Sequence, residues 1–241
     1  MSNPDDIEFS TVKFGNQYGP VHVGVQPLSA FTGWDNKRIT DDEKSLLIAM
    51  AENEGNFDSV QSYDSEIVSV GAMQKTINRE GKGEFSIQVW QFKQTNPHLY
   101  MELFEKYGWT VENDSQQPIM YFKGKTGNAL KDEIRRGFTS STYANKIKQN
   151  SPILGPLVYS TKNIEFQRKQ VDDFVYRLND VVLKIKPSNE YASTLGDYLK
   201  STLGKAIVLD HHVNRPAYVK RDFGKALNRF FEQNEHASRN P

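Results

Sequence analysis

The chain has 241 residues, and its 30 basic side chains balance 30 acidic ones. This length suits one sizeable domain or two small ones, and the zero net charge provides no overall field to attract nucleic acid or an anionic membrane. There is no cysteine, which excludes disulfides, thiol nucleophiles and cysteine metal sites. No apolar run approaches the roughly 18 residues of a membrane span. We therefore expect no nucleic-acid partner and no insertion into a membrane.

The N-terminal part of the chain is expected to be extended. Residues 1–38 contain β-prone pieces interrupted by Gly15, Gly19, Pro20 and Gly24, a pattern typical of a loose hairpin or an arm packed on the main body. The sequence predicts a boundary after this lead-in, with one main domain at 39–241.

The first clear helix has signals at both ends. Thr40 and Glu43 fit a capping box, in which each side chain binds a free N–H of the first turn. Apolar residues then recur through the segment to Glu54, and Gly55 occupies the position of a C-terminal glycine cap. A helix ending at Glu54 is therefore expected.

The rest of the chain reads as a short β segment followed by helices. Residues 56–74 combine β-branched residues with turn formers and predict a β-hairpin or small β-lobe. A loop around Pro118 and a break at residues 151–156 are expected between helices. Helices are predicted at 85–92, 97–107, 128–138, 163–184, 190–209 and 218–234. The expected class is mainly α (α+β), with a small β-hairpin lobe.

Glu54 is unusual because it continues an apolar stripe. Leu47, Met50, Ala51 and Glu54 share one helical face by the i, i+3, i+4, i+7 rule. Both partial burial and the negative end of the helix dipole disfavour a charged carboxylate there. A glutamate that holds its proton is what a general acid requires. The alternative is an exposed glutamate paired with a lysine at a helix end.

The residues that follow carry a resemblance to a known family. The run Glu54-Gly55-Asn56-Phe57-Asp58 and the later Gly71-Ala72-Met73-Gln74 resemble the lysozyme-like superfamily, which includes lytic transglycosylases and goose-type lysozymes. Ala72 stands where that family's element has leucine. The resemblance implies a lysozyme-like fold with a helical C-terminal lobe, making 39–241 the catalytic domain. It also implies muramidase activity, the cleavage of the β-1,4 bond between N-acetylmuramic acid and N-acetylglucosamine in peptidoglycan.

Carried over to this chain, the resemblance makes Glu54 the acid that protonates the glycosidic oxygen and places Gln74 in the sugar-binding groove. A hydrolase of this type needs a second carboxylate to hold water, whereas a lytic transglycosylase does not. Asp64, which follows the candidate substrate-binding residue Tyr63, is the preferred second acid, and Glu66 is the next. Asp58 is expected to organise the turn after the helix. Hydrolysis and transglycosylation both stay open.

Other chemistry has weaker support. The histidines are scattered and no HExxH occurs, so neither a metal nor another cofactor is expected. The N-terminus has no signal-peptide pattern, which suggests synthesis in the cytoplasm and action on the cell wall after release through phage holins or delivery by a secretion system. Glycan strands are the expected partner, with an immunity or delivery protein as a further one. The alternatives are a chitosanase or chitinase-type glycosidase, or a non-catalytic wall-binding module.

Overall fold

A computed structural model describes residues 3–36, 39–114, 117–188 and 190–239 of the chain. About 53% of the chain is helical and 15% is strand, which confirms the mainly α, α+β class. The chain forms two compact units, one of residues 1–34 and 51–171 and the other of residues 35–50 and 172–241. These boundaries differ from the expected division into 1–38 and 39–241, because the N-terminal segment shares a unit with the residues that follow Glu54.

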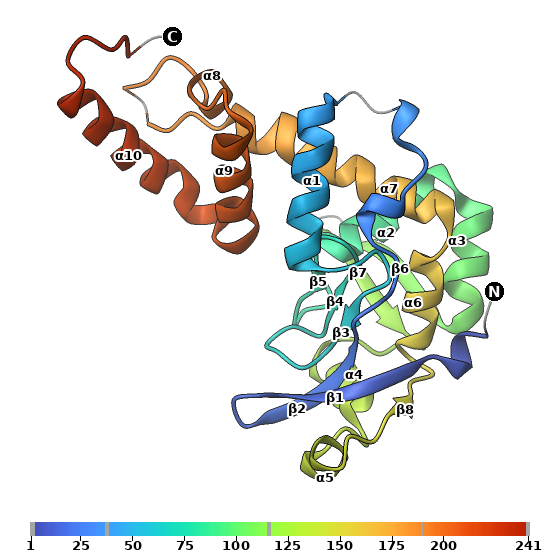
Figure 1. Ribbon diagram of the computed structural model, residues 1–241. Coiled ribbons are helices and arrows are strands. Elements are labelled where there is room, and N and C mark those ends of the chain that lie inside the picture. Colours follow the sequence, from blue (N-terminus) through green and yellow to red (C-terminus); the bar gives the residue numbers. More distant parts are fainter. Residues whose placement is uncertain (1–2, 37–38, 115–116, 189, 240–241) are drawn as a thin grey trace. The chain divides into compact units, whose positions relative to one another are not determined.

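The first unit is built around a six-stranded sheet in the order β5-β4-β3-β2-β1-β8, with all neighbours antiparallel (Figure 1). The lead-in forms a hairpin as expected, and its second strand pairs with the β segment that follows Glu54. The strands are β1 (Glu8–Phe14), β2 (Gln17–His22), β3 (Val60–Gln61), β4 (Val68–Val70), β5 (Lys75–Ile77) and β8 (Gln149–Asn150). The expected small β-lobe, β3–β5, is therefore half of a larger sheet.

A second, two-stranded sheet corrects the prediction of a loop around Pro118. Strands β6 (Trp109–Asp114) and β7 (Gln117–Phe122) form an antiparallel hairpin in which Asn113 pairs with Pro118. Proline is tolerated in such a strand at an edge. Trp109 and Val111 on one strand and Met120 and Phe122 on the other are buried, so the hairpin turns an apolar face to the core.

Helices surround these sheets and enclose an aromatic core. They are α2 (Glu84–Thr95), α3 (Pro97–Leu103), α4 (Gly127–Arg135), α5 (Ser140–Ala144), α6 (Gly155–Thr161) and α7 (Ile164–Tyr176), with short 3₁₀ turns at Pro4–Asp6, Leu28–Ala30, Trp34–Asn36 and Glu105–Tyr107. Phe166 packs edge-on against Phe85, Phe92 and Phe104. The expected break at residues 151–156 is wrong in part, because α6 begins there with Pro156 in its first turn, where proline is accepted.

Most of helix α1 (Asp41–Glu54) belongs to the second unit. Its capping box is confirmed: Thr40 N–H donates to Glu43 Oε2 at 3.1 Å, and Glu43 N–H donates to Thr40 Oγ1 at 3.2 Å. Lys205 Nζ also lies 3.0 Å from Glu43 Oε1. This ion pair links α1 to α9 (Thr202–Asn214) within the unit.

Two long helices expected in this region are interrupted. The predicted helix 163–184 becomes α7, a π-helical turn at Arg177–Val181 and a 3₁₀ turn at Val182–Lys184. The predicted helix 190–209 is divided into α8 (Leu195–Tyr198) and α9, because Ser201 begins a new helix by accepting a hydrogen bond from Gly204 N–H. A 3₁₀ turn at Pro216–Tyr218 leads into α10 (Val219–Gln233), close to the predicted 218–234.

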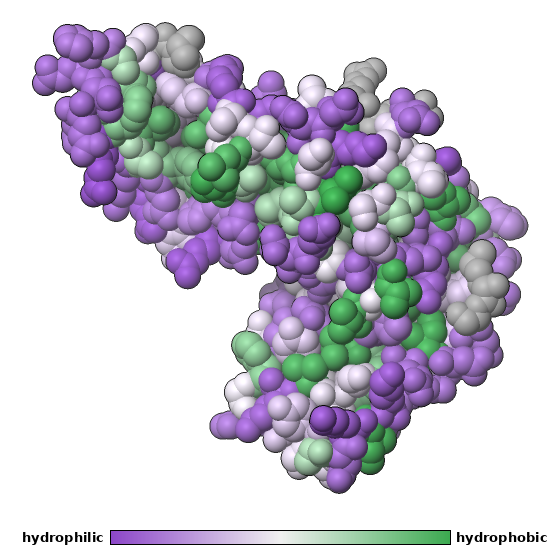
Figure 2. Space-filling view, in the orientation of Figure 1, coloured by the Kyte–Doolittle hydropathy of each residue, from purple (hydrophilic) through white to green (hydrophobic). Residues whose placement is uncertain are grey.

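The second unit keeps several large apolar side chains on its surface, and green areas over its helices are visible in Figure 2. The exposed ones on α9, α10 and the turn between them are Leu203, Ile207, Tyr218 and Phe230. Within the described part of the chain, no helix has the length and apolar character needed to cross a membrane.

Candidate functional site

Glu54 lies at the rim of a polar pocket of about 240 Å³ in the first unit. The lining comes from residues 52–56 at the end of α1, residues 21–23 of the N-terminal segment, and Ser59, Gln61 and Gln74. Leu47, Met50 and Ala51 are buried, as expected for the apolar stripe, and Glu54 itself is half-buried. The stripe thus continues to a carboxylate that borders a pocket.

Gln74 lines the same pocket. It follows β4 with a left-handed backbone conformation, φ +47°, and its Nε2 donates to Gly71 O at 2.8 Å. Its Oε1 is buried and has no hydrogen-bond donor in the described part of the structure. A non-glycine residue in this conformation and an unsatisfied buried acceptor both cost free energy, and such costs gather at functional sites.

Gly55 allows this approach. It directly follows the last residue of α1, as expected for a C-terminal glycine, but its φ is not among the positive values. A Cβ at Gly55 would instead lie 2.7 Å from Gln74 Nε2. The missing side chain is therefore needed for space, since it lets the amide of Gln74 come up against the end of α1.

The expected second acids do not line this pocket. Asp64 Oδ1 accepts the backbone N–H of Glu66 at 2.9 Å, which closes a turn, and Ser65 Oγ donates to Glu66 Oε1 at 3.2 Å. Tyr63 is also outside the pocket lining. The carboxylates that do line the pocket are Glu54 and the exposed Glu52.

Three cations instead hold the loop that carries Asp64. Arg135 Nη2 donates to Asp64 O at 2.6 Å, and both Lys131 Nζ and Arg79 Nε donate to Ser65 O, at 2.6 and 3.1 Å. Burial, with Arg135 and Arg79 nearby, lowers the pKa of Lys131 below its ordinary value. The contacts fix the backbone of the loop, so this cluster has a structural role.

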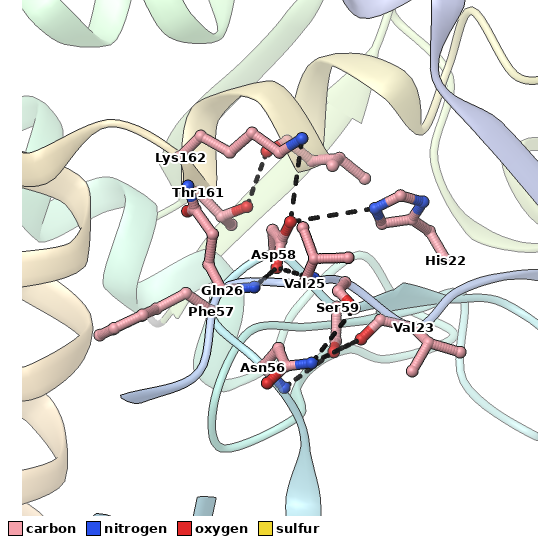
Figure 3. A network of polar contacts seen from close by, with 12 residues as sticks. His22, Val23, Val25, Gln26, Asn56, Phe57, Asp58, Ser59, Thr161 and Lys162 are labelled. Atoms are coloured by element: carbon pink, nitrogen blue, oxygen red, sulfur yellow. Dashed lines mark hydrogen bonds and ion pairs between the residues drawn. The ribbon is translucent and has the colours of Figure 1, made fainter. Parts of the chain in front are cut away.

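Asp58 is completely buried and lies at the centre of a network of polar contacts (Figure 3). Its Oδ1 accepts the backbone N–H groups of Val25 and Gln26, both at 2.9 Å. Its Oδ2 lies 3.8 Å from Lys162 Nζ and 4.0 Å from His22 Nε2. The expected turn-forming role of Asp58 is thus wider than predicted, because its bonds join the loop after α1 to the N-terminal segment.

More bonds join the same two segments. Asn56 Nδ2 donates to Gly24 O at 3.2 Å, Phe57 N–H donates to Gln26 O at 2.9 Å, and Ser59 Oγ donates to Val23 O. Figure 3 shows these contacts, and three of the residues that make them, Val23, Asn56 and Ser59, line the pocket. The lead-in is therefore an integral part of the site.

His22 is the pocket residue that sequence reasoning missed most clearly. Its Nδ1 lies 3.1 Å from Glu8 O, and because a carbonyl oxygen only accepts, Nδ1 must carry the hydrogen. Nε2 points toward Asp58 Oδ2 (Figure 3). Its neighbours in sequence give no sign of this, because its partner Asp58 is brought in by strand pairing between β2 and β3.

The described residues contain no group of three or more histidine, aspartate or glutamate side chains placed to hold a metal ion. Comparisons with family models, with curated proteins and with solved structures found no match.

Proposed function

We propose that this chain is a lysozyme-like muramidase that cleaves the β-1,4 bond between N-acetylmuramic acid and N-acetylglucosamine in peptidoglycan, with Glu54 as general acid. The observation that carries the proposal is that Glu54 and Gln74, the two residues singled out by the family resemblance, line one pocket. The antiparallel strands β3, β4 and β5 follow the glutamate helix, which is the arrangement that the resemblance implies.

The pocket offers suitable chemistry for a sugar. Ser59, Gln61, Gln74 and Asn56 supply hydroxyl and amide groups around the carboxyl group, and such groups bind sugar hydroxyl and N-acetyl groups. The buried Oε1 of Gln74 lacks a donor in the described structure, and a substrate N–H or O–H could supply it after a small rotation of the amide. A neutral polar ligand therefore suits this site.

The positions of Asp64 and Glu66 favour the reaction that needs a single acid. Glu54 would give its proton to the glycosidic oxygen as the bond from that oxygen to the anomeric carbon breaks. A hydroxyl group of the same sugar would then attack the anomeric carbon and return its proton to Glu54. The product is an anhydro sugar, and no second carboxylate is required.

The test is to compare Glu54→Gln with Asp64→Asn on purified cell walls. Glu54→Gln keeps the shape but removes the acidic proton, so we expect lysis to fall by about a hundredfold or more. Asp64→Asn keeps an oxygen for the turn, so we expect near-normal lysis with anhydro products in mass spectra.

Each other outcome has a distinct meaning. Unchanged lysis by Glu54→Gln would refute the assignment of the acid. Products that have gained water would refute the single-acid route and direct attention to Glu52, the other carboxylate at the pocket. Binding to walls with no cleavage by the natural chain would indicate a non-catalytic module. Faster cleavage of soluble chitosan than of peptidoglycan would favour a chitosanase.

A further inference from the structure

The hairpin β1–β2 presents one face that is continuous with the Glu54 pocket. Residues directly opposite each other in antiparallel strands lie on the same face, and so do residues two apart along a strand. Gln61 in the pocket pairs with Val21, which in turn pairs with Ser10. Phe14 is four residues after Ser10, and Tyr63 is two residues after Gln61. Alternation therefore places both on the same face of the sheet as Ser10, Val21 and Gln61, and we call this the outer face.

Side-chain contacts agree with this placement. Ser62, between Gln61 and Tyr63, is buried and its Oγ donates to Ile67 O at 2.5 Å, so its neighbours point the other way. The rings of Phe14 and Tyr63 lie with centroids 6.1 Å apart and planes inclined by 49°. Two aromatic residues from segments far apart in sequence therefore meet on the outer face.

The side chain of Phe14 is unusually exposed to solvent for a phenylalanine. Its exposure is 55%, whereas Phe9 on the same strand is completely buried. Tyr63 is half-buried beside it. A phenylalanine left in water at this position contributes little to the core, so its apolar ring is available to a ligand.

We propose that the N-terminal hairpin extends the glycan-binding groove, with Phe14 and Tyr63 forming an aromatic platform for a sugar ring of the strand beyond the cleaved bond. This inference rests on the proposed function. The apolar faces of a pyranose ring carry C–H groups that suit the negative face of an aromatic ring. Tyr63 lies two residues after Gln61, in the bend that follows β3, so the platform begins close to the pocket that Gln61 lines.

The same hairpin supplies a matched control. Tyr18, between Gln17 and Gly19, points to the opposite face, where its ring lies 5.7 Å from that of Tyr143 on α5. Tyr143 is 47% exposed, close to the value for Phe14. Tyr143→Ala therefore removes a similar exposed ring from a similar aromatic pair, but on the opposite face of the hairpin and outside the pocket lining.

The experiment measures cleavage of glycan strands stripped of stem peptides and separated by length. We expect Phe14→Ala and Tyr63→Ala to raise KM about tenfold on long strands, which corresponds to about 1.4 kcal/mol. The shortest cleavable fragments, which do not reach the platform, should be cut with unchanged kinetics. Phe14→Tyr should restore the natural KM, and Tyr143→Ala should match the natural chain at every length.

Equal KM values for Phe14→Ala and the natural chain on long strands would overturn the platform while leaving the muramidase proposal intact. So would an equal loss in Tyr143→Ala. Co-sedimentation with purified walls, with Glu54→Gln present in every variant, measures the contribution of the platform to wall binding in the absence of cleavage. If the natural chain cleaves no glycan but its binding to walls is lost in Phe14→Ala, the proposed reaction would be refuted and the platform would stand.

Discussion

Gly24 is held where only glycine fits. Its φ is +78°, and a Cβ built there would lie 2.4 Å from Asp58 Oδ1. The backbone at this point passes directly over the buried carboxylate, between Val23 and the N–H groups that Asp58 binds. Any side chain would have to displace the group that joins the N-terminal segment to the loop after α1.

We therefore expect Gly24→Ala to lower the free energy of unfolding by about 3 kcal/mol, from left-handed strain and overpacking together. Gly15→Ala is the control, since Gly15 also has positive φ, +58°, but nothing lies within 4 Å of its added Cβ. It should cost only about 1 kcal/mol. Denaturant unfolding measures both, and equal losses would show that the approach to Asp58 contributes nothing.

For single residues, the sequence predicts contacts with near neighbours in the chain but not contacts with residues far away in the chain. Glu54 could be singled out because its helical neighbours Leu47 and Ala51 define the buried face. The role of Asp58 could be anticipated only as a turn, because its partners Val25 and Gln26 are more than 30 residues away. The place of Asp64 outside the pocket lining could not be predicted, because strand alternation defines a face but not which pocket that face borders.

Glu43 serves both the start of α1 and the packing of the second unit. Burial alone would raise the pKa of its carboxyl group, but hydrogen bonds from Lys205 and from Thr40 N–H outweigh this, so the pKa lies below its ordinary value of 4.5. Folding therefore favours the charged form. The stability that follows is fully present above the unfolded pKa and is lost as the pH falls through the folded pKa.

We expect Lys205→Gln to lower the free energy of unfolding by about 1 kcal/mol near neutral pH. The difference from the natural chain should shrink as the pH falls below 4.5, because Glu43 then becomes protonated in both proteins. Unfolding curves at several pH values measure this. Adding Glu43→Gln should remove the pH dependence of the difference, and a constant difference at all pH values would contradict the pair.

Elements were predictable where their end signals are local. The capping box at Thr40 marks a helix start that the structure has. The hairpin β6–β7 replaces the predicted loop because Pro118 is typical of loops, although Trp109 and Val111 alternate as strand residues do. In that hairpin, burial of alternate side chains outweighs the lost N–H donor of one edge proline.

The two units differ in how much of their structure is buried. The first has a large continuous core that includes Phe85, Val89 and Phe92 of α2. In α10 of the second unit the buried residues are Val219, Gly224 and Phe231, spread over four turns. Amide exchange follows the local free energy of opening, which depends on such burial.

Hydrogen exchange followed by mass spectrometry should therefore show slow exchange for α2, β4 and β5, and exchange at least about tenfold faster for α10. Among the residues that line the Glu54 pocket, those in or next to β3, Ser59 and Gln61, should also exchange slowly. Equal protection of α10 and α2 would contradict this ranking and indicate that α10 is covered in solution.

The division into units could not be read from the sequence. A boundary near residue 38 was inferred from a change in local pattern, but Val21 pairs with Gln61 and Phe9 pairs with Gln149. Pairings over such distances depend on the whole set of strands competing for partners, and local periodicity does not encode this.

The position of β1 between β2 and β8 also has a consequence for synthesis on the ribosome. The hairpin β1–β2 is made first, yet β8, which pairs with Glu8 and Phe9 at the start of β1, is not translated until residues 149 and 150. Throughout that interval one side of the nascent hairpin keeps unpaired N–H and C=O groups, which can recruit a neighbouring chain. Rapid translation or crowded overexpression should thus favour aggregation, and a chaperone that shields this strand should raise the soluble yield.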